Sequence, residues 1–253
     1  MACAVVISVD MPSKPYKTSL TYWFPRVSKL GIPVPRTKII PIDREKVFPI
    51  FDGDECPYFT GLVSDLMKEA DKFGFPLFLR TDLSSEKHSW KNTCYVPNMN
   101  VLSKNLVSLL EFHELAGLFG LPYEAIVFRE FLDLEISFKA FRGEMPINRE
   151  RRYFVRNGKI ECHHPYWPEE VFNGQPMIFE PGTKGTWKER LAILNNEPEE
   201  EISFLTPLAE AAGAELGDYW SIDFAKAKDG TWYLIDMALG NESYHWEDCP
   251  HKK

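Results

Sequence analysis

The sequence predicts an α+β fold, in which antiparallel strands lie between helical segments instead of alternating with them. The middle of the chain, residues 125–163, is rich in strand patterns and carries an Asn157-Gly158 turn. Helical patterns come before and after it and a hairpin closes the chain, an order typical of α+β folds. Neither Gly-x-Gly-x-x-Gly nor Gly-x-x-x-x-Gly-Lys-Ser/Thr occurs, so Rossmann and P-loop folds are not expected.

The first half of the chain is expected to hold two units. Residues 1–60 form a small N-terminal α/β region, since 18–30 have helical spacing and Ile32-Pro33-Val34-Pro35 then forces an extended path into a strand at 37–40. Residues 61–124 form the second unit. Its elements are helices at 61–73 and 104–119 and strands at 75–79 and 92–96, with a loop at 81–91 between the strands.

Residues 125–253 are expected to form the third and largest unit. Its apolar and aromatic runs predict an antiparallel sheet, two helices and the closing hairpin. The strands are at 125–132, 136–141, 151–155 and 159–163, and the helices are at 186–195 and 200–216.

The closing hairpin carries the most informative pair of residues, Asp223 and Asp236. With Asp229-Gly230 as a two-residue turn, Phe224 pairs with Ile235 and Asp223 with Asp236, so two carboxylates share one face. Like charges in such a pair repel each other, and a cation bound by carboxylates, such as Mg²⁺, would offset the repulsion. The alternative is two exposed aspartates at a sheet edge.

Three cationic residues suit a phosphate ligand. Arg80 ends the strand at 75–79, and Lys87 lies in the hydroxyl-rich loop that follows, a composition that suits a triphosphate but that a solvated loop also shows. Arg152 lies in the strand at 151–155, where neighbouring arginines point to opposite faces. On a covered face it needs an anion, either one of the two aspartates or the terminal phosphate of a nucleotide.

The composition excludes several classes of protein. The 253 residues have a formal net charge of −8, which argues against general binding of nucleic acid or a membrane surface, and no apolar run approaches the roughly 20 residues of a membrane span. His163-His164 has no Cys or His at chelating spacing, so we expect no zinc site. Scattered cysteines without a Cys-x-x-Cys pair indicate a reduced, cytoplasmic protein; they are Cys3, Cys56, Cys94, Cys162 and Cys249.

Three motifs carry a resemblance to a known family. They are Arg129-Glu130-Phe131, the run Glu150-Arg151-Arg152-Tyr153-Phe154-Val155 and the run Trp232-Tyr233-Leu234-Ile235-Asp236-Met237. With the cationic strand end and the late acidic pair, the order resembles the ATP-grasp superfamily from about residue 75 to 246. It looks most like the arginine- and lysine-rich branch of phages and bacteria, and distantly like the eukaryotic cell-division-cycle ATP-grasp chaperone that assembles translation initiation factor 2.

The resemblance implies two cofactors, ATP and Mg²⁺, and assigns roles to residues of this chain. Two α+β subdomains would grip ATP, with the metal-binding hairpin in the C-terminal one. Ala238 stands where the family has an asparagine, for which Asn241 would substitute. The catalytic residues would be Arg80, Lys87 and Arg152; adenine and ribose would meet Arg129, Glu130, Phe131, Leu132 and Glu135; and the metal would be held by Asp223, Asp236 and Asn241.

The implied function is that of an ATP- and Mg²⁺-dependent carboxylate–amine ligase, which forms an amide-type bond through an acylphosphate. The carboxylate and amine substrates would be small molecules or a peptide or protein end, whereas a nucleic acid is not an expected partner. The alternative is an ATP-binding assembly chaperone without ligase turnover, which Ala238 favours. A third possibility is a degenerate family member with neither activity.

Overall fold

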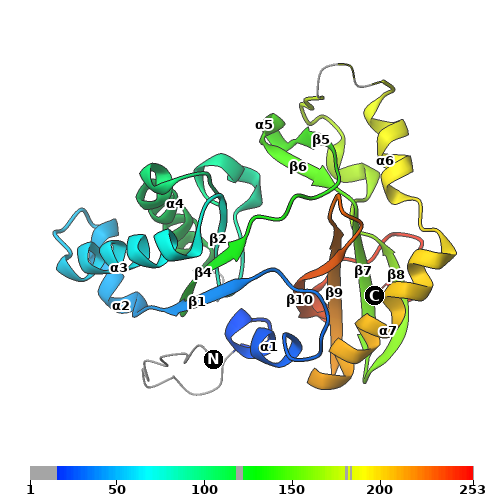
Figure 1. Cartoon of the computed structure of the whole chain (residues 1–253), viewed down its shortest axis with the longest axis horizontal. Helices are drawn as coiled ribbons and strands as arrows, with labels where there is room; N and C mark the ends of the chain where they lie inside the picture. Colours follow the sequence, from blue (N-terminus) through cyan, green and yellow to red (C-terminus); the bar gives the residue numbers. More distant parts are fainter. Residues whose placement is uncertain (1–15, 118–121, 180–181, 183, 253) are drawn as a thin grey trace.

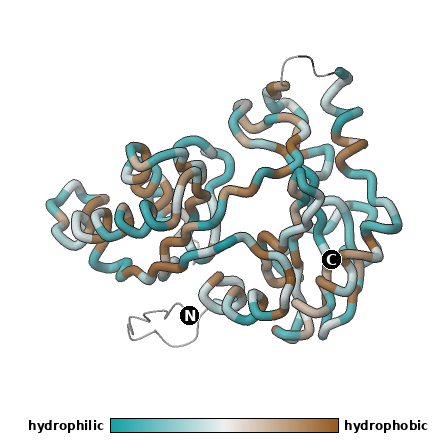
Figure 2. Tube along the Cα trace, in the orientation of Figure 1, coloured by the Kyte–Doolittle hydropathy of each residue, from teal (hydrophilic) through white to brown (hydrophobic). Residues whose placement is uncertain are grey.

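The computed structural model describes residues 16–117, 122–179, 182 and 184–252. It has two lobes, each built on a four-stranded antiparallel sheet, and a smaller unit built on a two-stranded sheet. Figure 1 shows the lobe with β1, β2 and β4 on one side and the lobe with β7–β10 on the other. Each lobe has its own cluster of buried hydrophobic residues (Figure 2).

The N-terminal lobe has the strand order β1-β4-β2-β3. Leu77 and Leu79 of β2 belong to the same buried cluster as Leu66 of the first long helix and Leu106 of the second. One face of this sheet is therefore packed against helices. The elements are β1 (Thr37–Pro41), α2 (Arg44–Val47), η1 (Phe48–Phe51), α3 (Pro57–Phe73), β2 (Leu77–Thr81), η2 (Lys87–Asn92), β3 (Tyr95–Val96), α4 (Met99–Gly117) and β4 (Ala125–Glu130).

The C-terminal lobe has the strand order β10-β9-β7-β8. Tyr153 and Val155 of β7 pack into one core with Leu205 of α7 and Trp23 of α1, so these two helices cover one face of the sheet. The elements are α1 (Leu20–Val27), β7 (Glu150–Arg156), β8 (Lys159–Pro165), α7 (Glu199–Leu216), β9 (Tyr219–Lys226), β10 (Trp232–Leu239) and η4 (Gly240–Glu242).

The smaller unit is a hairpin with helices beside it, and its second strand was not predicted from the sequence. It has a core of its own, in which Phe138 and Ile147 of the hairpin meet Leu191 of α6. Thr186 and Glu189 form a capping box that fixes the start of α6. The elements are β5 (Ile136–Ala140), α5 (Phe141–Glu144), β6 (Met145–Asn148), η3 (Glu169–Phe172) and α6 (Trp187–Asn195).

The structure divides the chain differently from the three consecutive units expected. Residues 16–60 do not form a region of their own, because α1 packs on the C-terminal lobe while β1 pairs with β4. The boundary between the lobes lies after Glu130 and not before Ala125, since β4 pairs with β1 and β2 through its whole length. Within the described residues, no helix has both the length and the apolar character needed to cross a membrane.

Candidate functional site

The closing hairpin pairs Asp223 with Asp236, as the sequence predicted, but by a different route. The turn has three residues instead of two, because Ala227 and Thr231 are hydrogen-bonded across it, and Gly230 takes the positive φ of 92°. Leu234 therefore pairs with Phe224, and a bulge at Ile235 restores the register before Asp236. The pairing of Phe224 with Ile235 was wrong, and the extra turn residue and the bulge compensate for each other.

The two carboxylates are each neutralised by an arginine. Arg152 holds both oxygens of Asp223, with Nε–Oδ1 and Nη2–Oδ2 distances of 2.8 Å, and Nη1 of Arg80 lies 3.1 Å from Oδ2 of Asp236. Arginines thus offset the repulsion from which a cation was inferred. Because each carboxylate oxygen can accept two hydrogen bonds, both aspartates keep capacity for a further ligand.

Strand alternation places the charged residues of both lobes on facing surfaces. In the N-terminal sheet, Phe78 pairs with Arg129 and is two residues from Arg80, so these three share the face opposite Leu77 and Leu79. In the C-terminal sheet, Arg152 pairs with Asp223, which pairs with Asp236, on the face opposite the one that α7 covers. The same alternation adds Glu150, two residues before Arg152.

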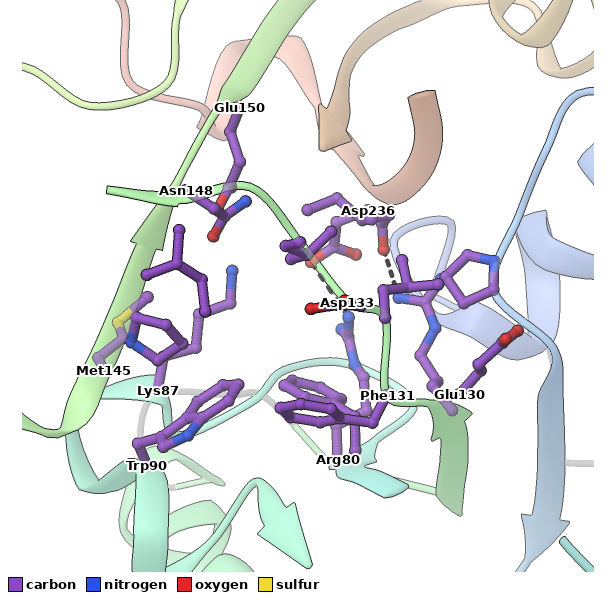
Figure 3. Close-up of a pocket in the computed structure, with 18 residues that line it drawn as sticks. Arg80, Lys87, Trp90, Glu130, Phe131, Asp133, Met145, Asn148, Glu150 and Asp236 are labelled. Atoms are coloured by element: carbon purple, nitrogen blue, oxygen red, sulfur yellow. Dashed lines mark hydrogen bonds and ion pairs between the residues drawn. The ribbon is translucent and has the colours of Figure 1, made fainter. Parts of the chain in front are cut away.

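A pocket lies between these two faces, with the β5–β6 hairpin beside it (Figure 3). It encloses about 850 Å³ including its open mouth, within the range of roughly 300–1,000 Å³ found for small-molecule sites. Lys87 reaches across from η2 toward Asn148 and Glu150 (Figure 3). The pocket is therefore built from both lobes and the smaller unit.

One end of the pocket is aromatic and apolar. The ring centroids of Trp90 and Phe131 lie 6.2 Å apart, and those of Phe78 and Trp90 lie 5.6 Å apart. Met145 and Pro146 of β6 complete this wall. Such a surface suits a flat apolar group, because aromatic faces bind planar rings by stacking.

The other end of the pocket is charged and has unsatisfied groups. Arg129 donates through Nη1 to the carbonyl of Ile235, but its buried Nε and Nη2 atoms have no hydrogen-bond partner in the described part of the chain, and neither does Oε2 of Glu150. Buried polar atoms are rarely left unpaired, so these atoms indicate a missing polar ligand. Together with Arg80 and Lys87, Arg129 brings three cations to the site.

Burial and neighbouring charges shift the pKa values in this pocket. Burial, together with the positive charge of Arg80, lowers the pKa of Arg129 to about 9. Burial raises the pKa of Glu150 to about 7, although Lys87 opposes that shift. For Lys87 burial alone would lower the pKa, but nearby acidic groups, Glu150 and Asp236 among them, outweigh burial and raise it. The site thus keeps its lysine charged and places an unpaired arginine beside it, an arrangement suited to an anion.

The structure brings most of the predicted site residues together. Arg80, Lys87, Asp236 and the segment Arg129, Glu130, Phe131 and Leu132 line the pocket. Arg152 and Asp223 lie beside it, where the Cζ atom of Arg152 is 4.6 Å and the Nζ atom of Lys87 is 5.5 Å from the centroid of the Tyr166 ring.

Two predicted residues lie elsewhere. Glu135 is exposed with its Oε2 3.7 Å from Nε of Arg149, and it lines a separate groove, because its backbone N–H is bonded to the carbonyl of Lys226 beside β9. Asn241 is exposed in η4 and does not line the pocket. We therefore assign neither a ribose contact to Glu135 nor a metal contact to Asn241.

Sequence reasoning missed two pocket residues, Glu150 and Trp90. Glu150 was quoted only as part of a motif, although alternation with Arg152 was a signal that could have placed it on the same face. Trp90 was counted with a solvated loop, and only the rings of Phe131 and Phe78 around it show that this part of the loop is a wall.

Comparison with known proteins identifies the fold. A family of ATP-grasp domains, family 3 of the arginine- and lysine-rich clade, matches residues 69–248. Among solved structures, C-terminally truncated Cdc123 from Schizosaccharomyces pombe is 14% identical with a TM-score of 0.55, over 88% of this chain and 83% of that one. Its likeness at this identity concerns the fold alone. The sequence matches no curated protein.

Two further structures are similar at lower TM-scores. The ATP-grasp ligase PsnB, complexed with its minimal precursor, is 13% identical with a TM-score of 0.43, and the match covers 88% of this chain and 52% of that one. A RimK domain protein ATP-grasp from Sphaerobacter thermophilus DSM 20745 is 12% identical with a TM-score of 0.44, over 88% and 59%. This chain thus spans about half the length of PsnB.

Proposed function

Because this chain belongs to the arginine- and lysine-rich clade of the ATP-grasp family, we propose that it is an ATP- and Mg²⁺-dependent ligase that joins a carboxylate to an amine. The observation that carries the proposal is the buried guanidinium of Arg129, two of whose nitrogens have no partner in the described chain, between an aromatic wall and two further cations. A nucleotide has the matching parts, a planar base and a chain of anionic phosphates.

The aromatic wall would hold adenine and the cations would hold the phosphates. Phe131 and Leu132 follow β4 directly and would contact the base, while Arg129 and Arg80 would bind phosphate oxygens. Arg152 uses Nε and Nη2 for Asp223, so Nη1 is the atom through which it would reach the terminal phosphate.

The metal would be held by Asp223 and Asp236. Carboxylate oxygens suit Mg²⁺, which is usually bound through one or two carboxylates together with phosphates. When bound, the ion would neutralise charge on the phosphates. In this arrangement Arg80 and Arg152 would orient the two carboxylates that they already hold.

ATP would supply a phosphoryl group that activates the substrate carboxylate. The carboxylate oxygen attacks the γ-phosphorus and ADP leaves; the amine nitrogen then attacks the carbonyl carbon and phosphate leaves, which forms the amide bond. The task of Arg80, Lys87 and Arg152 is to position the transferring group and stabilise its charge, and loss of one such contact typically costs about 10²–10³ in rate.

The test is ADP release with a panel of amino acids and peptides as carboxylates and hydroxylamine as the amine. We expect release that depends on the carboxylate and yields a hydroxamate, and a rate about 10²–10³ lower in Arg152→Ala. Arg156→Ala, four residues along the same strand in a pair with Glu161, is the matched control and should retain the wild-type rate. Binding of ATP with no turnover for any carboxylate would contradict the ligase and favour the assembly-chaperone alternative.

A further inference from the structure

A cluster of three potential metal ligands lies outside the nucleotide pocket. Cys162 comes from β8, and His245 and Cys249 come from the segment that follows η4. The Sγ atoms of the two cysteines are 3.5 Å apart, and Nδ1 of His245 lies 3.3 Å from Cys249 Sγ and 3.7 Å from Cys162 Sγ. Residues far apart in the sequence thus bring two sulfurs and one nitrogen to a single point.

These distances match the edges of a tetrahedral zinc site. Bonds of about 2.3 Å to sulfur and about 2.0–2.1 Å to nitrogen at tetrahedral angles give edges of roughly 3.8 Å between sulfurs and roughly 3.5 Å between sulfur and nitrogen. All three observed distances lie close to these values. Thiolate and imidazole ligands in this geometry are typical of Zn²⁺.

The surroundings of His245 orient it as a ligand. Its Nε2 is 3.2 Å from the hydroxyl of Tyr219, and an N–H donated there leaves the lone pair of Nδ1 directed at the two sulfurs. Its ring stacks on Phe154 with centroids 3.6 Å apart, and the residue is only 8% exposed. Metal-binding histidines are commonly fixed in this way, by a hydrogen bond on the other ring nitrogen.

From this geometry we propose that Cys162, His245 and Cys249 bind a Zn²⁺ ion, with a water molecule as the fourth ligand. Both cysteines are partly exposed, so water reaches that position. Burial, followed by the contact with Cys249, raises the pKa of the Cys162 thiol to about 12, so zinc binding would displace a proton that the metal-free protein holds.

The proposed ion would attach the end of the chain to the C-terminal sheet. β8 is the edge strand of that sheet, and Cys162 pairs with Phe154, two residues from Arg152. The segment after η4 therefore lies over the same sheet face that carries Arg152 and Asp223. The inference does not depend on the proposed ligase activity, since it concerns different residues.

The test is titration of the reduced, metal-free, full-length protein with Co²⁺ and then Zn²⁺. We expect one equivalent of Co²⁺ to give thiolate charge-transfer and tetrahedral d–d absorption, which Zn²⁺ abolishes. Competition with a chromophoric chelator should show zinc binding at least 100-fold weaker in Cys162→Ser and Cys249→Ser. Cys56→Ser is the matched control, because Cys56 is also partly exposed but lies beside Lys46 in the other lobe, and it should bind as the wild type does.

Tyr219→Phe keeps all three ligands and tests the site independently of the cysteine variants. We expect it to weaken zinc binding by about 10-fold, the lower end of the effect of groups that orient a ligand. Zinc should also slow amide hydrogen exchange in residues 243–252 of the wild type, and a chelator should reverse this. The proposal is overturned if the reduced wild type binds no stoichiometric Co²⁺ or Zn²⁺, if both cysteine variants bind as tightly as the wild type, or if mass spectrometry of protein isolated without reductant finds a Cys162–Cys249 disulfide.

Discussion

Arg129 and Arg151 are both buried, but their surroundings differ. Arg151 donates from Nε to Glu201 at 2.5 Å, and its other nitrogens donate to the carbonyls of Leu194 and Asn196 at 3.1 and 2.6 Å. Arg129 has the carbonyl of Ile235 as its hydrogen-bond acceptor and leaves two nitrogens without a partner among the described residues. The first arrangement stabilises the fold, whereas the second fits a binding site.

Replacement of these arginines by methionine is therefore expected to have opposite effects on the free energy of unfolding. Arg129→Met should raise it by about 1–3 kcal/mol, because an uncompensated buried charge is removed, and Arg151→Met should lower it by about 3 kcal/mol, because Glu201 is left buried and unpaired. Urea unfolding without nucleotide measures both. Destabilisation of similar size in the two variants would contradict the assignment of Arg129 to ligand binding.

Glu150 makes stability depend on pH. Its pKa is about 7 in the folded protein, against the ordinary value of 4.5 for a glutamate in the unfolded chain, so the folded state holds one proton more between these values. Stability from this group is fully present below pH 4.5 and is lost as pH rises through 7.

Glu150→Gln removes this proton and its pH dependence. The free energy of unfolding of the variant, relative to that of the wild type, should rise between pH 5 and pH 8 by up to about 3 kcal/mol, at 1.36 kcal/mol per pKa unit. Urea unfolding of both proteins across this range is the measurement, and the contributions of other titrating groups cancel in the difference. A difference that stays constant with pH would show that Glu150 ionises normally.

At the scale of elements, two glycines within helices show how closely each helix packs. A Cβ atom on Gly213 of α7 would lie 2.4 Å from Cγ1 of Val155, whereas one on Gly61 of α3 would meet nothing within 4 Å. Gly213 therefore allows α7 to approach β7 closely, and Gly61 has no such role.

Alanine at these two positions should act in opposite directions. Gly61→Ala should raise the free energy of unfolding by about 0.5–1 kcal/mol, because alanine favours helix. Gly213→Ala gains the same helix preference but should lower stability by about 1–3 kcal/mol, because the added methyl overpacks the contact with Val155. Thermal or urea unfolding checks both, and stabilisation by Gly213→Ala would show that α7 does not press on β7.

The element scale also shows which predictions the sequence could support. Long helices with clear ends were predicted well: the helix expected at 61–73 is α3, and the one expected at 200–216 is α7. The turn and bulge of the closing hairpin were not predicted, because Asp229-Gly230 fits turns of two or three residues equally and a bulge leaves no mark in hydrophobic alternation. β6 was missed because the short run Met145–Asn148 contains a proline.

At the scale of the whole molecule, the site depends on long-range pairing that local patterns do not reveal. The resemblance of the sequence to ATP-grasp proteins identified the fold and most pocket residues in advance. It did not show that β1 joins the sheet of β4, that Glu135 faces another groove, or that Cys162 meets His245 and Cys249. Each of these depends on which strands become neighbours, and that choice is made by the three hydrophobic cores together.

Both lobes contribute to the pocket, and their direct links cross it. Arg80 of the N-terminal sheet pairs with Asp236, and Arg129 donates to Ile235, both on β10 of the C-terminal sheet. A ligand that binds these arginines would therefore contact both lobes at once. The central claim is that this ligand is ATP with Mg²⁺.

Calorimetric titration of the wild type with ATP, in the presence and absence of Mg²⁺, tests that claim most directly. We predict saturable one-to-one binding that strengthens with Mg²⁺ and weakens at least about tenfold in Arg129→Met, a loss of roughly 1.4 kcal/mol, while Arg156→Met binds as the wild type does. Absence of ATP binding to the wild type, or equal affinity in Arg129→Met, would contradict the claim.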